Sequence, residues 1–324
     1  MICISVIVPM YNVEEYIGNC IRQLLKQDID KEIILIDDGS TDRTLEIAQE
    51  FVDRYPNIKL VRQDHSGQSA ARNKGLFTAR GEYIFFCDSD DYVEEQSLKE
   101  LYKICKAHDL DILKTGWKTK CDDSVIVNTP PHQFGFTDAV LTTSDMLKKS
   151  VSRWYNVIPW NGVYRKSFLS DHNITFPEGI QFEDNTFALH TMIADPNARI
   201  MQIDFPFYIV NVRSGSTTTS KPLPKKIYDQ LKNIELMNDL IDEYHLQGST
   251  YNAAKKTVSS LTFTMTSYYY RIDKSFRKEV SLVIPHHVLA SAIKYPQTLF
   301  QKMKLIIFTY SRRLLDCFED YIKS

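Results

Sequence analysis

The chain has 324 residues, enough for one large domain or two of medium size, and its 39 basic and 41 acidic side chains leave a formal net charge of −2. A balance this even argues against a general affinity for nucleic acid. No run of about 18 uncharged apolar residues is present, so no membrane-spanning segment is predicted. No secretory signal peptide is expected, because the first apolar strand begins almost at Met1.

The six cysteines are scattered and form no C-x-x-C pair. Cys3, Cys20 and Cys87 lie in apolar segments, so they are predicted to be small core residues in a reducing compartment. Together with the missing signal peptide, this predicts a cytoplasmic protein.

The first 115 residues alternate between strand and helix patterns. Buried strands are predicted at 4–8, 32–36, 58–61, 83–87 and 111–113, and helices between them at 13–25, 45–51, 69–76 and 97–107. Asn12 followed by Glu15 predicts an N-cap for the first helix. This alternation indicates an α/β fold with a mostly parallel sheet and right-handed crossovers.

The regular alternation of predicted strands and helices ends after residue 116. A strand is predicted at 124–127, a helix at 144–151, another at 182–193 and two short strands within 199–210; the remainder is helical, at 225–245, 250–270, 286–293 and 296–318. The Pro-Leu-Pro sequence at 222–224 marks the best boundary. We therefore predict a catalytic domain at 1–221, with halves 1–115 and 116–221, and a helical region at 222–324.

The strand at 83–87 runs directly into Asp88, Asp90 and Asp91. Three carboxylates so close together repel one another unless a cation lies among them. A divalent cation that keeps positions open for substrate phosphates suits them. The alternative is a solvated turn, in which Asp and Ser are common.

Polar clusters follow four predicted strands, at 9–12, 37–42, 64–73 and 88–91. The carboxyl ends of parallel strands meet at one edge of a sheet, which is where ligands bind in open α/β sheets. These clusters are therefore predicted to build one site.

The same four clusters carry a resemblance to a known family. Residues 6–12 (VIVPMYN), 36–42 (IDDGSTD), 71–75 (ARNKG) and 86–91 (FCDSDD) look like successive signatures of family 2 glycosyltransferases. The resemblance covers about residues 1–217. It implies the GT-A fold, which is Rossmann-like, with a helical C-terminal extension here, and an inverting mechanism.

The resemblance implies roles on the nucleotide side of the site. Pro9 and Tyr11 would line the base pocket, and Asp38 would accept hydrogen bonds from base or ribose. Arg72 and Asn73 would hold the loop beside the base or contact the donor sugar and phosphate. Helix capping or a surface position is the alternative for Asp38 and Arg72.

The sequence Asp88-Ser89-Asp90 resembles the family's Asp-x-Asp motif. In that case Asp90 would bind Mn²⁺ or Mg²⁺, and Asp88 would contact the ribose or donor sugar. Arg213 and Ser216 resemble a later Arg-Ser segment and would contact the diphosphate, unless they form a solvated turn.

Residues on the acceptor side complete the predicted site. Glu183 and Asp184 resemble the family's Glu-Asp pair, and Asp184 is the predicted catalytic base, with Glu183 as an acceptor contact. Trp160 and Asn161 resemble the Trp-Asn motif and would contact acceptor sugar; a buried core Trp is the alternative. Gly162 stands where the family frequently has a Lys.

The last predicted helix is amphipathic and basic. Residues 271–324 hold ten Lys or Arg and five Asp or Glu. The segment 295–318 could lie on an anionic membrane surface, or pack on its own domain or on a partner in a homo-oligomer.

Taken together, these patterns predict a metal-dependent hexosyl- or N-acetylhexosaminyltransferase. The donor would be a nucleotide-diphosphate sugar, with UDP favoured, and the acceptor a glycan or lipid-linked oligosaccharide of a bacterial surface polysaccharide. A non-catalytic nucleotide-sugar-binding or assembly module is the alternative. A dinucleotide oxidoreductase is excluded because no G-x-G-x-x-G follows the first strand.

Overall fold

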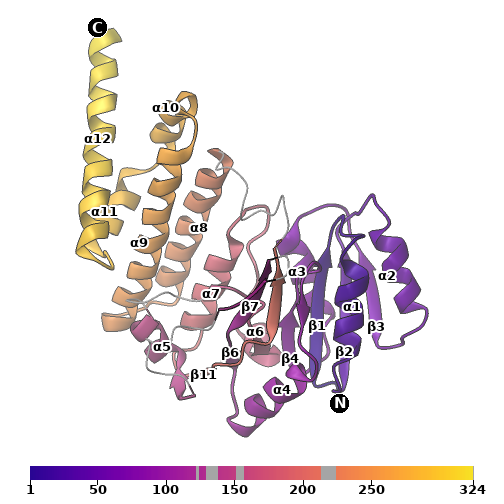
Figure 1. The fold of residues 1–324 in the computed structure, drawn as a ribbon. Helices are drawn as coiled ribbons and strands as arrows, with labels where there is room; N and C mark the ends of the chain where they lie inside the picture. Colours follow the sequence, from indigo (N-terminus) through magenta and orange to yellow (C-terminus); the bar gives the residue numbers. More distant parts are fainter. Residues whose placement is uncertain (122–123, 129–137, 151–156, 213–223, 324) are drawn as a thin grey trace.

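The computed structural model describes residues 1–121, 124–128, 138–150, 157–212 and 224–323. A central eight-stranded sheet forms the body of the protein (Figure 1). Its strands, in spatial order, are β3 (Ile58–Arg62), β2 (Lys31–Asp37), β1 (Ile4–Met10), β4 (Tyr83–Phe86), β10 (Gly162–Arg165), β6 (Ile112–Lys114), β11 (Arg199–Gln202) and β9 (Val140–Thr142).

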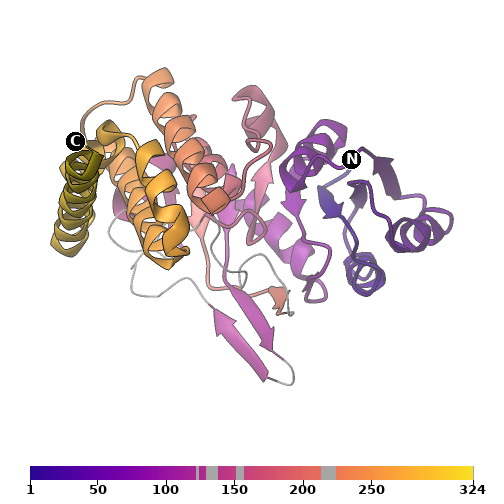
Figure 2. The ribbon, with the colours of Figure 1, turned by 90° about the horizontal axis from the view of Figure 1, so that it is seen from above.

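A second sheet of four strands lies beside the first. Its order is β5 (Tyr92–Val93), β12 (Tyr208–Asn211), β7 (Trp117–Cys121) and β8 (Ser124–Asn128). Strands β7 and β8 form a hairpin that extends away from the body of the protein (Figure 2).

Helices are interspersed with the strands up to β12, and the helices from α8 onward follow one another without strands. They are α1 (Ile17–Leu25), α2 (Thr44–Val52), α3 (Gln68–Thr78), α4 (Ser97–Ala107), α5 (Thr143–Ser150), α6 (Lys166–Asp171), α7 (Glu183–Ile193), α8 (Pro224–Glu243), α9 (Gly248–Arg271), α10 (Lys274–Val283), α11 (His286–Lys294) and α12 (Leu299–Lys323). The predicted α/β fold with a helical C-terminal region is thus confirmed.

Alternate residues of the central strands enter two hydrophobic cores, because successive strand side chains point to opposite faces. Ile7 and Phe86 pack with α7 and the C-terminal helices, whereas Val6 and Phe85 pack with α1 and α4. The first core runs without interruption from the sheet to Phe308 in α12. The helices on either side of the boundary predicted at 222–224 therefore share one core; residues 222 and 223 lie outside the described part of the chain.

Two details of the sheet differ from the sequence prediction. Strand β10 is antiparallel to both β4 and β6, and β9 is antiparallel to β11, so the sheet is mixed. Both strands are only three or four residues long, too short for a periodic pattern to stand out.

Asn12 is not the N-cap of the first helix, which begins at Ile17 after Tyr16. The Asn12 backbone is left-handed, with φ of 50°. Its side-chain Oδ1 accepts a hydrogen bond from the Thr41 backbone N–H at 2.8 Å. A tertiary bond between the ends of β1 and β2 thus replaces the predicted local cap.

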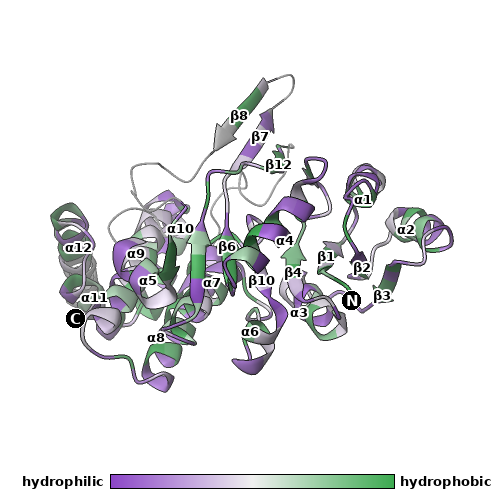
Figure 3. Ribbon diagram, turned by 90° about the horizontal axis from the view of Figure 1, so that it is seen from below, coloured by the Kyte–Doolittle hydropathy of each residue, from purple (hydrophilic) through white to green (hydrophobic). Residues whose placement is uncertain are grey.

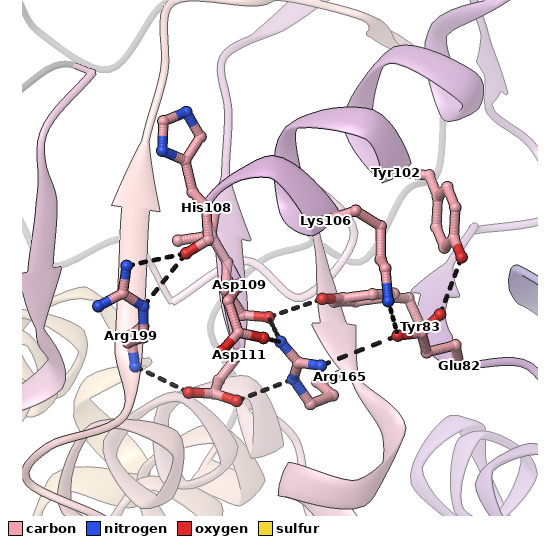
Figure 4. A network of polar contacts seen from close by, with 10 residues as sticks. Glu82, Tyr83, Tyr102, Lys106, His108, Asp109, Asp111, Arg165 and Arg199 are labelled. Carbon is pink, nitrogen blue, oxygen red and sulfur yellow. Dashed lines mark hydrogen bonds and ion pairs between the residues drawn. The ribbon is translucent and has the colours of Figure 1, made fainter.

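Ion pairs hold the mixed centre of the sheet at the edge where β4 and β6 begin (Figure 4). Arg165, at the end of β10, donates to Asp111 at 3.0 Å and to Asp109 at 2.7 Å. Lys106 and Tyr102 bind Glu82 at 2.7 and 2.8 Å. These contacts fix the strand order at one edge, while the loops of the opposite edge are left for the polar clusters.

Gly162 is required by the close approach of β10 to β6. A Cβ at this position would lie 2.0 Å from the Leu113 carbonyl oxygen, which belongs to the neighbouring backbone and cannot turn aside. We expect Gly162→Ala to lower the free energy of unfolding by about 3 kcal/mol, measured by urea denaturation. In the control Gly18→Ala, the nearest atom is the flexible end of Arg22, at 3.3 Å, and stability should be kept or raised. Equal stability of the two variants would contradict this account.

Candidate active site

A cleft of about 820 Å³ lies at the carboxyl ends of β1, β2 and β4. Its volume is in the range of small-molecule binding sites. Residues from all four predicted clusters reach it, and the start of α7 closes the other side. Asp90 and Asp184, far apart in the sequence, both line it.

Arg72 connects the two sides of the cleft. Its guanidinium donates to Asp88 Oδ1 at 2.9 Å and to Glu183 Oε1 at 2.8 Å, and it lies 5.2 Å from the centre of the Phe176 ring. Burial alone would lower the pKa of Arg72, but Asp88 and Glu183 outweigh it and raise that pKa. The buried charge is thus kept by two carboxylates that would otherwise repel a ligand's phosphates.

Asp91 also lines the cleft, but its hydrogen bonds stabilise the fold. Its carboxylate accepts hydrogen bonds from the Tyr208 hydroxyl at 2.9 Å and from the Asn211 backbone N–H at 2.8 Å. Burial, followed by the charges of Asp88 and Asp90, raises the pKa of Asp91 to about 8. This side chain ties the loop after β4 to β12.

Asp90, on the same loop, is half-buried and lines the cleft. No group of three or more His, Cys, Asp or Glu side chains suited to hold a metal occurs in the described ranges. A cation here would therefore take most of its ligands from phosphate oxygens and water, as Mg²⁺ commonly does. Besides Asp91, five acidic side chains line the cleft against the basic side chains Arg72 and Lys226, so the residues present fit such a cation.

Asp184 stands at the start of α7, on the side of the cleft that faces the loop after β4. Burial and then the charge of Glu183 raise the pKa of Asp184 to about 6, and Arg72 opposes them. Its Oδ1 accepts a hydrogen bond from Asn185 Nδ2 at 2.9 Å. Asp184 is therefore mostly ionised at neutral pH. Its pKa is close enough to neutral pH for the side chain both to take up and to release a proton.

Asp38 organises the loop after β3. Its Oδ1 accepts from the Ser66 backbone N–H at 2.8 Å, and its Oδ2 accepts from the Gly67 backbone N–H at 2.9 Å. The His65 ring of this loop stacks on Tyr11, with 4.1 Å between ring centres. Tyr11 is 43% exposed, so this aromatic pair offers a surface for a planar ligand group. Pro9 lines the same part of the cleft.

Trp160 lies on the cleft, but its neighbour Asn161 does not. The Trp160 ring stacks on Tyr208 at 4.3 Å between ring centres. Asn161 is fully buried, and its Nδ2 donates to the Thr115 carbonyl at 3.1 Å. The structure therefore places Asn161 behind the cleft wall, where it supports the loop that carries Trp160.

Asn73 also lies away from the cleft lining. Its side chain exchanges two hydrogen bonds with the Phe176 backbone, at 2.8 and 2.9 Å, and donates to Glu178 at 2.9 Å. It thereby fixes the segment that precedes α7. Arg213 and Ser216 lie outside the described residues.

Lys114 was missed by the sequence analysis. This buried residue ends β6, and its ammonium donates to the Ile158 carbonyl at 2.6 Å, to Asn161 Oδ1 at 3.1 Å and to the Tyr164 hydroxyl at 2.7 Å. Burial lowers the pKa of Lys114 to about 7, although attraction to Asp184 acts in the opposite direction. A single charged residue at the end of an apolar strand was the available signal.

Three further cleft residues come from segments with no site-like pattern. Phe182 precedes α7 and stacks on Tyr268 of α9 at 5.9 Å between ring centres, and Lys226 of α8 lies beside them. The helical region therefore forms part of the cleft. No local signal could show this, because only the packing of α8 and α9 against α7 brings these side chains there.

Comparisons with known proteins agree with the motifs. The sequence profile of Glycosyl transferase family 2 matches residues 5–172. EpsJ of Bacillus subtilis, described as an uncharacterized glycosyltransferase, is 30% identical over 314 residues, which are 94% of this chain and 89% of EpsJ. TarS of Staphylococcus aureus, a poly(ribitol-phosphate) beta-N-acetylglucosaminyltransferase, is 31% identical over 255 residues, 76% of this chain and 42% of TarS.

Solved structures show the same fold. The crystal structure of TarS 1–349 in complex with UDP-GlcNAc has a TM-score of 0.71, covering 98% of this chain and 92% of that one at 22% identity. The mannosyltransferase PcManGT from Pyrobaculum calidifontis, in complex with GDP-Man and Mn²⁺, has a TM-score of 0.53, covering 95% and 84% at 14% identity. These likenesses confirm the GT-A fold.

Lys114 gives the stability a pH dependence that can be measured. Its pKa is about 7 in the folded protein and has the ordinary lysine value, 10.5, in the unfolded chain. Between pH 7 and pH 10.5, the Lys114 side chain is protonated in the unfolded chain but mostly neutral in the folded protein, so the free energy of unfolding rises with pH. Below pH 7 the side chain is charged in both states, and the folded protein carries the full cost of a buried charge. Between pH 7 and 9 its contribution should rise by about 2 kcal/mol.

We expect Lys114→Met to lose this increment, seen as the difference from the wild type in urea denaturation at pH 7 and 9. The exposed Lys103 on α4 provides the control Lys103→Met, which should keep the wild-type increment. An unchanged pH response in Lys114→Met would show that Lys114 titrates normally.

Proposed function

Because the chain belongs to Glycosyl transferase family 2, we propose that it transfers a sugar, with inversion, from a nucleotide-diphosphate sugar to a hydroxyl group of an acceptor. The observation that carries this proposal is that Asp90 and Asp184, from distant parts of the chain, line one and the same cleft. One carboxylate can serve the diphosphate while the other serves the acceptor hydroxyl.

In this reaction Asp184 removes the proton of the acceptor hydroxyl. The acceptor oxygen then attacks the anomeric carbon from the side opposite the leaving group, and the bond from that carbon to the diphosphate breaks. The electron pair stays on the diphosphate, and the proton stays on Asp184. The raised pKa of Asp184, about 6, suits a base that works at neutral pH.

The donor side is formed by the ends of β1, β2 and β4. We assign the nucleotide base to the Tyr11–His65 aromatic pair, because a base is planar and Tyr11 is partly exposed. Asp38 holds the loop that carries His65. UDP is the favoured nucleotide, supported by the likeness to TarS 1–349 in complex with UDP-GlcNAc.

Asp90 would hold a divalent cation, Mn²⁺ or Mg²⁺, together with the diphosphate. When bound, such a cation neutralises charge on the leaving group. Asp88 and Ser89 flank this position, and Asp88 is already fixed by Arg72. Arg213 and Ser216 stay predictions for further diphosphate contacts.

The acceptor is assigned to the side of the cleft built by Trp160, Glu183, Phe182, Tyr268 and Lys226. Aromatic rings and a few polar groups are suited to a sugar or polyol chain. The name of the relative TarS, a poly(ribitol-phosphate) glycosyltransferase, supports an acceptor in bacterial surface polysaccharide synthesis.

The role of Asp184 can be tested by replacing it with an amide. Asp184→Asn keeps the shape of the side chain but removes the proton acceptor, so UDP release from a panel of UDP-linked sugars should fall at least about 100-fold. Binding of UDP, measured by calorimetry, should stay close to that of the wild type. The exposed Asp171 gives the control Asp171→Asn, which should keep both. Retained turnover in Asp184→Asn would exclude it as the base.

The role of Asp90 can be tested separately, by UDP binding with and without Mn²⁺. In the wild type Mn²⁺ should tighten UDP binding, and in Asp90→Asn this gain should shrink at least about tenfold. Asp64→Asn changes an exposed carboxylate of the nearby loop and should leave the gain intact. If Asp90→Asn responds to Mn²⁺ like the wild type, Asp90 is not the ligand.

A further inference from the structure

Helix α12 is the outermost helix of the C-terminal region (Figures 1 and 2). One face of it packs inward. Leu305 and Phe308 are buried, and the Phe308 ring contacts Tyr269 and Tyr270 of α9 at 5.1 and 5.8 Å between ring centres. The described side chains of this helix extend to Ser311.

The other face of α12 is exposed and apolar, and its side chains are at least 55% exposed. They are Leu299, Phe300, Met303, Ile307 and Tyr310. A helix turns about 100° per residue, so these positions form one stripe about 100° wide. Such exposure of large apolar side chains in one place marks an interaction surface.

Basic side chains border this stripe on both sides. By the same helical geometry, Lys304 lies about 40° beyond one edge and Lys302 about 60° beyond the other. Both are exposed, and the Lys304 ammonium lies 4.6 Å from the centre of the Phe300 ring. Residues 299–313 contain four Lys or Arg and no Asp or Glu. Both hydrophobic and hydrophilic positions of this outer helix are visible in Figure 3.

We propose that this face of α12 lies on an anionic membrane surface, with the stripe among the acyl chains and the lysines at the headgroups. An apolar stripe between rows of basic residues is the pattern of interfacial helices. None of the helices in the described part of the chain is apolar over a long enough stretch to cross a bilayer, so the contact is parallel to the surface.

Charge decides between a membrane and a second copy of the chain. A symmetric pairing of two stripes through residues 299–313 would bring basic borders together, and this segment holds no Asp or Glu to balance them. An anionic bilayer supplies that balance.

The same stretch of α9 joins this surface to the cleft. Tyr268 lines the cleft, and Tyr269 and Tyr270 contact Phe308 of α12. The membrane contact would hold the acceptor side of the cleft near the bilayer. The contact itself stands independently of the proposed transfer reaction.

Vesicle co-sedimentation of the full chain tests the proposal. The wild type should sediment with vesicles of equal parts phosphatidylcholine and phosphatidylglycerol, and not with phosphatidylcholine alone. Partitioning should fall strongly in the double variant Met303→Ser/Ile307→Ser, and about 25-fold in Lys302→Gln/Lys304→Gln. High salt should weaken it.

Phe77→Ser serves as the control, since Phe77 is 94% exposed on the distant helix α3, and it should bind vesicles like the wild type. Thermal unfolding and sedimentation velocity check that each variant folds and whether it self-associates. Wild-type binding by the stripe variant, equal binding to both kinds of vesicle, or self-association through the stripe without vesicle binding would each overturn the proposal.

Discussion

Arg72 joins Asp88, which follows β4, to Glu183, which begins α7, through ion pairs of 2.9 and 2.8 Å inside the protein. A buried guanidinium is stable only where its charge is matched, and losing one charged partner of such a group costs about 3–5 kcal/mol. The two carboxylates come from parts of the chain that share no strand pairing. Their attachment to one cation sets the distance between the loop after β4 and α7, and hence the width of the cleft.

The aspartates near the Arg72 guanidinium have different surroundings, and these surroundings determine whether each carboxyl group is paired, protonated or open to the cleft. Asp88 is neutralised by Arg72, and Asp91 is tied to Tyr208 with a pKa raised to about 8. Asp90 faces the cleft, and Asp184 has a pKa raised to about 6 by burial. Residue type alone does not separate these four side chains; burial and neighbours do. In the proposed reaction, this separation would let one acidic cleft bind a cation at one place and accept a proton at another.

The helical region lines part of the cleft and shares a hydrophobic core with the sheet. Lys226 and Tyr268 bring α8 and α9 into the cleft, and the hydrophobic core continues from the sheet to α12. This continuous core therefore connects α12 to the side of the cleft that we assign to the acceptor. If α12 rests on a bilayer, the orientation of the cleft toward a membrane-bound acceptor follows from the fold itself.

Sequence patterns predicted five of the six strands and all four helices of the first 115 residues, because buried strands and amphipathic helices leave long periodic patterns. The two-residue strand β5 is too short to leave one. Because polar residues after parallel strands converge, Asp38, Arg72 and Asp90 could also be predicted to share one site. Asp184 was added to that site by the resemblance to family 2 glycosyltransferases. Two features could be found only in the tertiary structure: β10 runs antiparallel to its neighbours, and the ammonium of Lys114 supports the cleft wall from behind. These depend on contacts between residues distant in the chain, and such contacts leave no local pattern of spacing or composition.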